Sequence, residues 1–339
     1  MTDHTPSIGI VGAGSVGVNA AYDLTRAGAK VTFVVRPHRQ AQLSRPQVMY
    51  SYDDNSLDEF SGFDVITDPA ALSDRQLDFV IVTLDNASLR AEAGITLTKA
   101  IGHAFRGTNT GVILNAVGIE VVPWFIEQSG LSKEQVVVGN TGALIHEVAA
   151  ANLPVDASVD EDLLAQADYA VKRMGPQGFI IDDNSPALAT AFTAAYAGQG
   201  TPSAGVASSA ETAVGTAMLA PILAWGLLDW QFLDTVDAAN ETWKLGVDSM
   251  REIQKLHVFG TAGQAAAEQT TPENVLQALR QMTELAKPLD FAGFTAYHHG
   301  GKVNQQDLDF IHDARQRVQA EGQDVTALSE LASRLEKAS

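Results

Sequence analysis

The sequence predicts an α/β fold in its first half and an all-helical arrangement after it. Up to about residue 140, short apolar runs rich in β-branched residues alternate with helical patterns. From Ala204 onward almost all of the periodicity is helical. Strands that alternate with helices are typical of a doubly wound parallel sheet, since each parallel connection needs a crossover helix. We therefore expect a parallel α/β domain followed by an all-helical C-terminal domain.

Five strands of the sheet are expected to be buried on both faces, because their runs are apolar throughout. They are Ile8–Val11, Val31–Val35, Phe79–Thr83, Val112–Leu114 and Val136–Val138. Helical spacing lies between strands at Val16–Ala27 and Leu89–Phe105. This alternation supports the parallel sheet.

The second half begins after a break. An Ala-rich helix at Pro186–Ala197 is followed by glycine and proline residues within 198–202, which interrupt helices. The later helical patterns are Thr212–Leu233 (one buried helix or two), Asn240–Leu256, a helix with Thr271 as its N-cap, Asn304–Gly322 and Thr326–Ala338. A chain of 339 residues is long enough for two domains, which we place at residues 1–200 and 201–339.

Charge and composition exclude several classes of partner. The net charge of −19 disfavours binding to nucleic acid and to anionic membrane surfaces, both of which require basic patches. The absence of cysteine excludes disulfides and thiolate zinc sites, and no histidine pair has metal-ligand spacing. The start of the chain shows no signal-peptide pattern, and the longest apolar stretch, 213–228, is interrupted by Gly215 and Pro221. We expect a cytoplasmic protein without nucleic-acid, membrane or metal partners.

A glycine-rich loop follows the first predicted strand and precedes a helix. Its sequence is Gly12-Ala13-Gly14-Ser15-Val16-Gly17, which has the spacing G-x-G-x-x-G. Gly12 permits a tight turn, Gly14 lets the backbone approach a pyrophosphate, and Gly17 permits close packing of helix on strand. The helix N-terminus then offers free N–H groups to the phosphates. These features predict a Rossmann-type domain whose loop binds a nicotinamide dinucleotide.

The end of the second strand favours NADP(H) over NAD. The segment is Val34-Val-Arg36-Pro-His38-Arg39, with no carboxylate to bind the ribose hydroxyls. A guanidinium at Arg36 suits a 2′-phosphate, and a basic cluster is conspicuous in so acidic a chain. The alternative is a solvated loop with ordinary charges.

These motifs resemble those of the ketopantoate reductase family. Further similar segments are Thr83-Leu84-Asp-Asn86 after a strand, Ile113-Leu-Asn115-Ala-Val-Gly118, Ala220-Pro221-Ile-Leu-Ala, and the stretch from Tyr297 to Ile311. The resemblance implies an NADP-binding domain, a helical substrate and dimerisation domain similar to the C-terminal domain of 6-phosphogluconate dehydrogenase, and a homodimer.

The resemblance also implies positions for the binding residues. Leu84 and Asn115 would lie beside the cofactor, and Asn115 would also lie near the substrate and the reacting atoms. Asp307 matches the position of a substrate-binding glutamate, and Thr295 that of a substrate-binding serine.

Two expected lysines are missing. Counting back from Pro221 places Thr212 where the family has its proton-donating lysine and Thr216 where it has a substrate-binding asparagine. Asp85 replaces a second lysine. Thr212 and Thr216 could hydrogen-bond a substrate hydroxyl or carbonyl, although threonines on an apolar helix are more often packing residues. We expect a substrate other than ketopantoate.

Histidine is the candidate replacement for the proton donor. His298 and its neighbour His299 lie in a glycine-flanked segment, and an imidazolium can donate a proton near neutral pH. The alternative is that one or both are surface or capping residues.

The sequence thus predicts an NADP(H)-dependent oxidoreductase that transfers hydride to or from a small carbonyl or hydroxyl compound in the interdomain cleft. Two alternatives remain open at this point. One is an NADP(H)-binding protein with an isomerase-like or regulatory role, and the other is an imine or opine reductase.

Overall fold

The structure is a computed structural model that describes residues 4–198 and 200–338. The chain divides into two compact units. The first unit contains the residues up to 116 together with 121–152 and 157–208, and the second contains 117–120, 153–156 and the chain from 209 onward.

The first unit is built on an eight-stranded sheet with the order β12-β11-β8-β7-β6-β1-β2-β5. The strands are β1 Ser7–Val11, β2 Lys30–Val34, β5 Asp64–Ile66, β6 Phe79–Val82, β7 Gly111–Leu114, β8 Val136–Thr141, β11 Gln177–Asp182 and β12 Ser203–Ala207. All neighbouring pairs are parallel except β8 with β11. The five predicted strands are the centre of this sheet, and the predicted fold class is confirmed.

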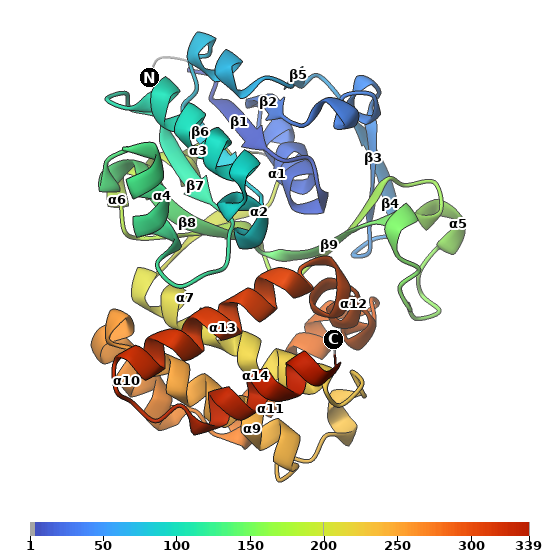
Figure 1. Ribbon diagram of the computed structural model, residues 1–339. Coiled ribbons are helices and arrows are strands. Elements are labelled where there is room, and N and C mark those ends of the chain that lie inside the picture. Colours follow the sequence, from blue (N-terminus) through green and yellow to red (C-terminus); the bar gives the residue numbers. More distant parts are fainter. Residues whose placement is uncertain (1–3, 199, 339) are drawn as a thin grey trace. The chain divides into compact units, whose positions relative to one another are not determined.

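Helices cover both faces of the sheet (Figure 1). On one face, α1 Ser15–Arg26 and α6 Pro186–Tyr196 share a core with Ile8 and Ile10 of β1. On the other face, α3 Glu92–Phe105 and α4 Val121–Ser129 pack on the opposite side chains of the same strands. Side chains that alternate between two apolar cores explain why these strands are apolar throughout.

The single helix expected at Leu89–Phe105 is wrong at its start. The structure has a short helix, α2 Asn86–Arg90, and then α3. Ala91 separates them because its backbone is extended, with φ −68° and ψ 161°. Alanine is a strong helix former, so its sequence carries no signal for this break.

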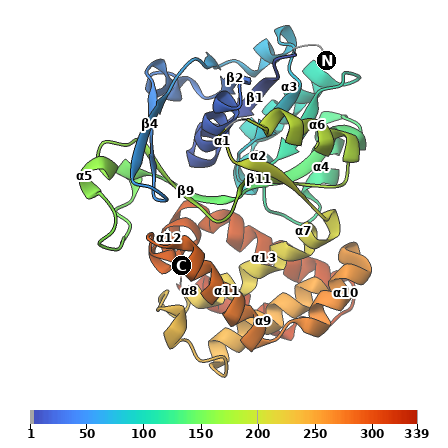
Figure 2. The same ribbon diagram turned by 180° about the vertical axis from the view of Figure 1, so that it is seen from behind.

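A second sheet in the same unit was not predicted (Figure 2). Its order is β4-β3-β10-β9, with β3 Gln47–Ser51, β4 Ser56–Phe60, β9 Ala143–Glu147 and β10 Tyr169–Arg173. The short helix α5 Glu161–Leu164 precedes β10. The expectation of helix from Ala204 onward is also wrong for its first residues, because Ser203–Ala207 pairs with β11 as an edge strand.

The second unit is predominantly helical, as expected. Its helices are α7 Ser209–Gly215, α8 Leu219–Gly226, α9 Glu241–Gln254, α10 Gly260–Gln269, α11 Pro272–Ala286, α12 Phe291–Tyr297, α13 Asn304–Ala320 and α14 Thr326–Ala338. The predicted N-cap is confirmed, since the Thr271 hydroxyl accepts a hydrogen bond from the Asn274 amide at 3.2 Å. Among the described residues, no helix combines the length and apolar character needed to cross a membrane.

Candidate functional site

The glycine loop joins β1 to α1 at the carboxyl edge of the parallel sheet. Gly12 has φ +98°, a backbone conformation that residues other than glycine rarely adopt. A Cβ at Gly17 would lie 2.2 Å from the carbonyl oxygen of Gly12, whereas a Cβ at Gly14 would meet no atom within 4 Å. The backbone angle of Gly12 and the close contact at Gly17 therefore require glycine at these two positions. Gly14 instead leaves open space at the N-terminus of α1. This is the cradle that a pyrophosphate needs.

Thr83 supports the loop from the next strand, a role that the sequence analysis did not assign. Its hydroxyl donates to the Val11 carbonyl at 2.9 Å. The same oxygen would lie 2.7 Å from a Cβ at Gly12, and Leu84 would lie 3.6 Å from that Cβ. The sequence signal that could have indicated this role is a hydroxyl residue directly after an apolar strand.

The basic residues after β2, Arg36, His38 and Arg39, differ in their contacts. Arg39 is held by the loop, because its Nη2 donates to the Ala13 carbonyl at 2.7 Å and to Glu147 at 2.8 Å. The side chains of Arg36 and His38 are exposed and make no hydrogen bond or ion pair with the described residues. Arg36 is thus the guanidinium that remains available for an anionic ligand at this edge.

Asn115 and Asp85 follow neighbouring parallel strands, β7 and β6. The Asn115 side chain donates to the Gly139 carbonyl at 2.9 Å, and its backbone N–H donates to the Val82 carbonyl. Asp85 caps α2 by accepting from the Ser88 amide at 2.8 Å and from the Ser88 hydroxyl at 2.7 Å. Since these strands end at the same edge as β1, Asn115 lies on the side of the sheet that carries the glycine loop.

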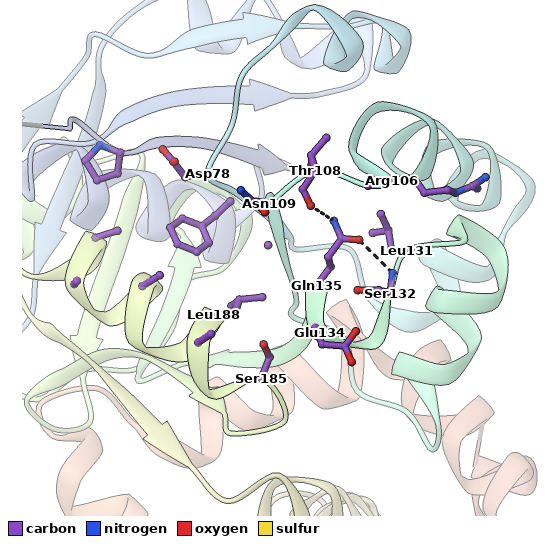
Figure 3. Close-up of a pocket in the computed structure, with 18 of the residues that line it drawn as sticks. Asp78, Arg106, Thr108, Asn109, Leu131, Ser132, Glu134, Gln135, Ser185 and Leu188 are labelled. Atoms are coloured by element: carbon purple, nitrogen blue, oxygen red, sulfur yellow. Dashed lines mark hydrogen bonds between the residues drawn. The ribbon is translucent and has the colours of Figure 1, made fainter. Parts of the chain in front are cut away.

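A cavity of about 940 Å³ lies at the opposite edge of this sheet (Figure 3). Its walls include Asp78, Phe79 and Gly111, which stand at the amino ends of β6 and β7, and Leu188 of α6. Ligands of doubly wound sheets bind outside the carboxyl ends of the strands. This cavity is therefore separate from the glycine loop.

Three candidate threonines lie in the second unit. Thr212 is half-buried on α7, and the hydroxyl of Thr216 donates to the Ala213 carbonyl at 2.7 Å. Thr295 is buried and donates to the Phe291 carbonyl at 2.6 Å. The hydroxyl protons of Thr216 and Thr295 are donated to backbone carbonyls three and four residues earlier, so only their lone pairs are available to a ligand.

The surroundings of His298 disfavour the imidazolium form that we expected. Its ring stacks on Phe294 with a centroid distance of 5.7 Å, and its Nδ1 is buried without a hydrogen-bond partner among the described residues. Burial, followed by the nearby charges of His299 and Lys302, lowers its pKa to about 3. An imidazole with this pKa is neutral at physiological pH, which disfavours His298 as a cationic proton donor.

His299 has a different environment although it is the next residue. Its Nδ1 lies 2.7 Å from Oδ2 of Asp307, whose side chain is fully buried. Asp307, which we expected to contact the substrate, therefore points at a histidine and has no exposed surface. Both residues belong to the second unit, at the π-helical turn His298–Lys302 and at the start of α13.

The lowered pKa of His298 predicts an acid-dependent loss of stability. The unfolded chain, in which histidine titrates near pH 6.5, binds this proton more readily than the folded protein does. The contribution is therefore fully present above pH 6.5 and is lost as the pH falls toward 3, with a slope of up to about 1.4 kcal/mol per pH unit. Urea unfolding between pH 4 and 7 should show a shallower pH dependence for His298→Leu than for the wild type. The exposed His103→Leu is the control, and equal slopes for His298→Leu and the wild type would contradict the assignment.

Comparison with family models gives a match within the first part of the chain. Residues 8–143 match the model of the family described as ketopantoate reductase PanE/ApbA. The resemblance inferred from the sequence is thus confirmed, and the match supports an NAD(P)-dependent oxidoreductase. A comparison with curated protein sequences gave no significant match.

Solved structures share the fold over almost the whole chain. A PanE/ApbA family ketopantoate reductase from Ralstonia eutropha JMP134 is 18% identical, with a TM-score of 0.61 and coverage of 97% of both chains. A probable 2-dehydropantoate 2-reductase from Bacillus subtilis is 16% identical, with a TM-score of 0.63 over 98% of this chain and 100% of that one. D-mandelate dehydrogenase in complex with NADH is 14% identical, with a TM-score of 0.65 over 98% of both chains. At these identities the similarity is one of fold.

Proposed function

We propose that this chain is an NADP(H)-dependent oxidoreductase that reduces a small carbonyl compound or oxidises the corresponding alcohol. The observation that carries the proposal is the glycine loop, in which Gly12 and Gly17 are required by local contacts while the space beside Gly14 is open. An open position at the N-terminus of α1 serves no packing purpose, but it fits a pyrophosphate.

The candidate site residues of the first unit each have a role in this proposal. The amides after Gly14 bind the pyrophosphate, and Arg36 pairs with the 2′-phosphate of the adenosine ribose. Asn115, held by the Gly139 carbonyl, orients the groups near the nicotinamide. When bound, the nicotinamide supplies or accepts the hydride. Thr212, Thr216 and Thr295 of the second unit are proposed to offer lone pairs to substrate hydroxyl groups.

The substrate is proposed to differ from ketopantoate. Neither α7 nor α8 contains lysine, and Asp85 is occupied as the N-cap of α2. An α-keto acid requires a cation near its carboxylate and an acid near its carbonyl. The absence of lysine from these helices favours a less anionic carbonyl compound.

The direct test is a binding and turnover experiment with the purified protein. We expect NADPH to bind, and its absorbance to fall in the presence of one or more members of a panel of aldehydes, ketones and keto acids. Tight binding of NADPH without oxidation by any carbonyl class would contradict the redox reaction and favour a regulatory or isomerase-like role. Failure to bind either NADPH or NADH would overturn the proposal.

The choice between the two dinucleotides is tested by Arg36→Ala. Hydrogen bonds to a charged group contribute about 1.5–3 kcal/mol, so NADPH should bind roughly 10- to 150-fold more weakly. NADH, which has no 2′-phosphate, should bind almost as it does to the wild type. Arg75→Ala is the matched control, since it removes one guanidinium from an exposed ion pair of the same unit. An unchanged ratio of NADPH to NADH affinity in Arg36→Ala would show that NADP is not preferred through this residue.

We also propose a homodimer. Within the apolar segment 218–233, Leu219, Leu223 and Trp225 are buried in the core of the second unit. The exposed apolar side chains of this unit include Phe232, at 67% exposure, and Leu285, at 50%. A solved dimeric ketopantoate reductase from Staphylococcus aureus has a similar fold. Light scattering at micromolar concentration should give twice the chain mass, and a monomer would reject the proposal.

A further inference from the structure

We infer that Arg39 and Tyr169 position the glycine loop for the dinucleotide by holding the carbonyl group of Ala13 from outside the loop. Both are positioning residues, because the groups assigned to the pyrophosphate belong to the loop itself. The inference rests on the proposed function, since it concerns the binding of the dinucleotide that this function requires. All of the contacts that support it lie within the first unit.

The Ala13 carbonyl oxygen accepts hydrogen bonds from two side chains that come from different elements. Nη2 of Arg39, at the end of the 3₁₀ turn Pro37–Arg39, donates to it at 2.7 Å. The Tyr169 hydroxyl, at the start of β10, donates to the same oxygen at 3.3 Å. A single partner is enough to satisfy a backbone carbonyl. The second donor therefore fixes the direction of this carbonyl beyond what its hydrogen-bonding requirement explains.

Each of the two donors is itself held by a further side chain. Glu147 of β9 accepts from the same Nη2 of Arg39 at 2.8 Å, and the two side chains are 29% and 30% exposed. Tyr169 is fully buried, and its hydroxyl accepts from the Gln42 side chain at 3.0 Å. Burial and the charge of Glu147 raise the pKa of Tyr169 to about 12, so the hydroxyl keeps the proton that it donates. The positions of both donors are thus set by the second sheet and by the segment after β2.

The direction of the Ala13 carbonyl determines the direction of the Gly14 amide. In a trans peptide, the C=O group and the following N–H lie in one plane and point in opposite directions. The peptide between Ala13 and Gly14 is trans, and its C=O is directed at Arg39 and Tyr169. Gly14 is exposed, and its N–H makes no hydrogen bond with the described residues. The two donors therefore keep this N–H pointing away from them and available to a phosphate oxygen.

This arrangement gives Arg36 and Arg39 different effects on the two dinucleotides. Arg36 has a side chain available for the 2′-phosphate, which NADPH carries and NADH lacks. Arg39 acts through the Ala13 peptide on the pyrophosphate, which both dinucleotides contain. Loss of Arg36 should thus weaken the binding of NADPH alone, whereas loss of Arg39 should weaken the binding of both.

Titration of the purified protein with NADPH and with NADH tests this assignment. For Arg39→Met we expect both dinucleotides to bind roughly 10- to 100-fold more weakly, because misplacement of about 1 Å in a positioned site costs on the order of 100-fold. The ratio of the two affinities should remain that of the wild type. Arg45→Met is the matched control and should bind as the wild type does, since Arg45 pairs with Asp168, next to Tyr169, instead of with the loop.

The other outcomes of this titration are distinct. A loss confined to NADPH in Arg39→Met would show that this guanidinium binds the 2′-phosphate, and it would overturn the positioning role. Wild-type affinity for both dinucleotides would also overturn that role, and so would an equal loss in Arg45→Met. A wild type that binds neither dinucleotide would instead overturn the proposed function.

Tyr169→Phe tests whether the two donors share one task. Alone, it should weaken both dinucleotides by roughly 2- to 10-fold, the usual effect of one neutral hydrogen bond. Combined with Arg39→Met, it should cause a loss greater than the product of the two single losses, because each donor alone still holds the Ala13 carbonyl. Single losses that simply multiply would mean that the donors act independently, and would overturn their shared role.

A measurement on the free protein tests the contact without a dinucleotide. Labelling alanine carbonyls with ¹³C and glycine amides with ¹⁵N gives an NMR signal from the Ala13–Gly14 peptide. In Arg39→Met the Ala13 carbonyl signal should move upfield and the Gly14 amide signal should shift, because a charged donor has been removed. Arg45→Met should leave both signals unchanged. Wild-type shifts in Arg39→Met would overturn the inference, whatever the affinities for the dinucleotides are.

Discussion

Gly17→Ala is expected to abolish measurable NADPH binding. The added methyl group would lie 2.2 Å from the Gly12 carbonyl oxygen and 2.9 Å from the Thr83 hydroxyl. The first contact is with backbone, so the loop itself must move away from α1 and its amides lose their alignment with the pyrophosphate. Since displacement of about 1 Å in a positioned site costs on the order of 100-fold, we expect at least that loss of affinity in a fluorescence titration.

Two other glycines make this test specific. A Cβ at Gly14 meets no atom within 4 Å and the residue has φ −78°, so Gly14→Ala should leave the free energy of unfolding nearly unchanged. The same Cβ projects into the space that we assign to the phosphates, so NADPH binding should still weaken. Gly215→Ala, which also meets no atom within 4 Å, lies on α7 and should change neither property. Wild-type affinity in Gly17→Ala would show that the loop does not hold the dinucleotide.

The parts of the fold that the sequence predicted are those with strong local signals. The central strands are apolar on both faces, and Thr271 followed by proline is a complete helix start. The edge strand at Ser203–Ala207 has no such signal, because serine, alanine and glycine are poor strand formers. Its conformation depends on parallel pairing with β11, in which Val206 is opposite Ile181. Long-range pairing of this kind cannot be read from a window of neighbouring residues.

In the candidate site, too, features with a local sequence signal were predicted and features that depend on tertiary contacts were not. The spacing of the glycines was sufficient to predict the loop, because each glycine has a local steric reason. His298 and His299 are adjacent and chemically identical in the sequence, so nothing there could show which is buried and which is paired. The difference arises from the π-helical turn and from Asp307, eight residues further along, whose side chain comes back to the turn from α13. The direction in which each ring points is a tertiary property, so the sequence could not show that burial disfavours the cationic form of His298.

Arg173→Met is expected to be the most destabilising single substitution proposed for the first unit. The Asp23 carboxylate is fully buried on α1, where it accepts from Nη1 of Arg173 at 2.9 Å and from the Tyr196 hydroxyl at 2.6 Å. These three side chains connect α1, β10 and α6. Methionine would leave the carboxylate buried with one neutral donor from this set, and removing one partner of a buried ion pair costs about 3–5 kcal/mol. Burial and the Asp23 charge also raise the pKa of Tyr196, so its hydroxyl stays protonated and cannot replace the cation.

The expected loss in the free energy of unfolding distinguishes this buried network from an ion pair on the surface. Arg75→Met removes an arginine whose partner Asp64 is largely exposed, and such pairs contribute about 0–1 kcal/mol. Urea unfolding at neutral pH should therefore place Arg173→Met several kcal/mol below the wild type and Arg75→Met within about 1 kcal/mol of it. Tyr196→Phe should lie between them, since it removes one hydrogen bond to a charged group and leaves the ion pair in place. Equal losses for the two arginine variants would mean that water reaches Asp23, and that the contact between α1 and β10 is not held by a buried charge.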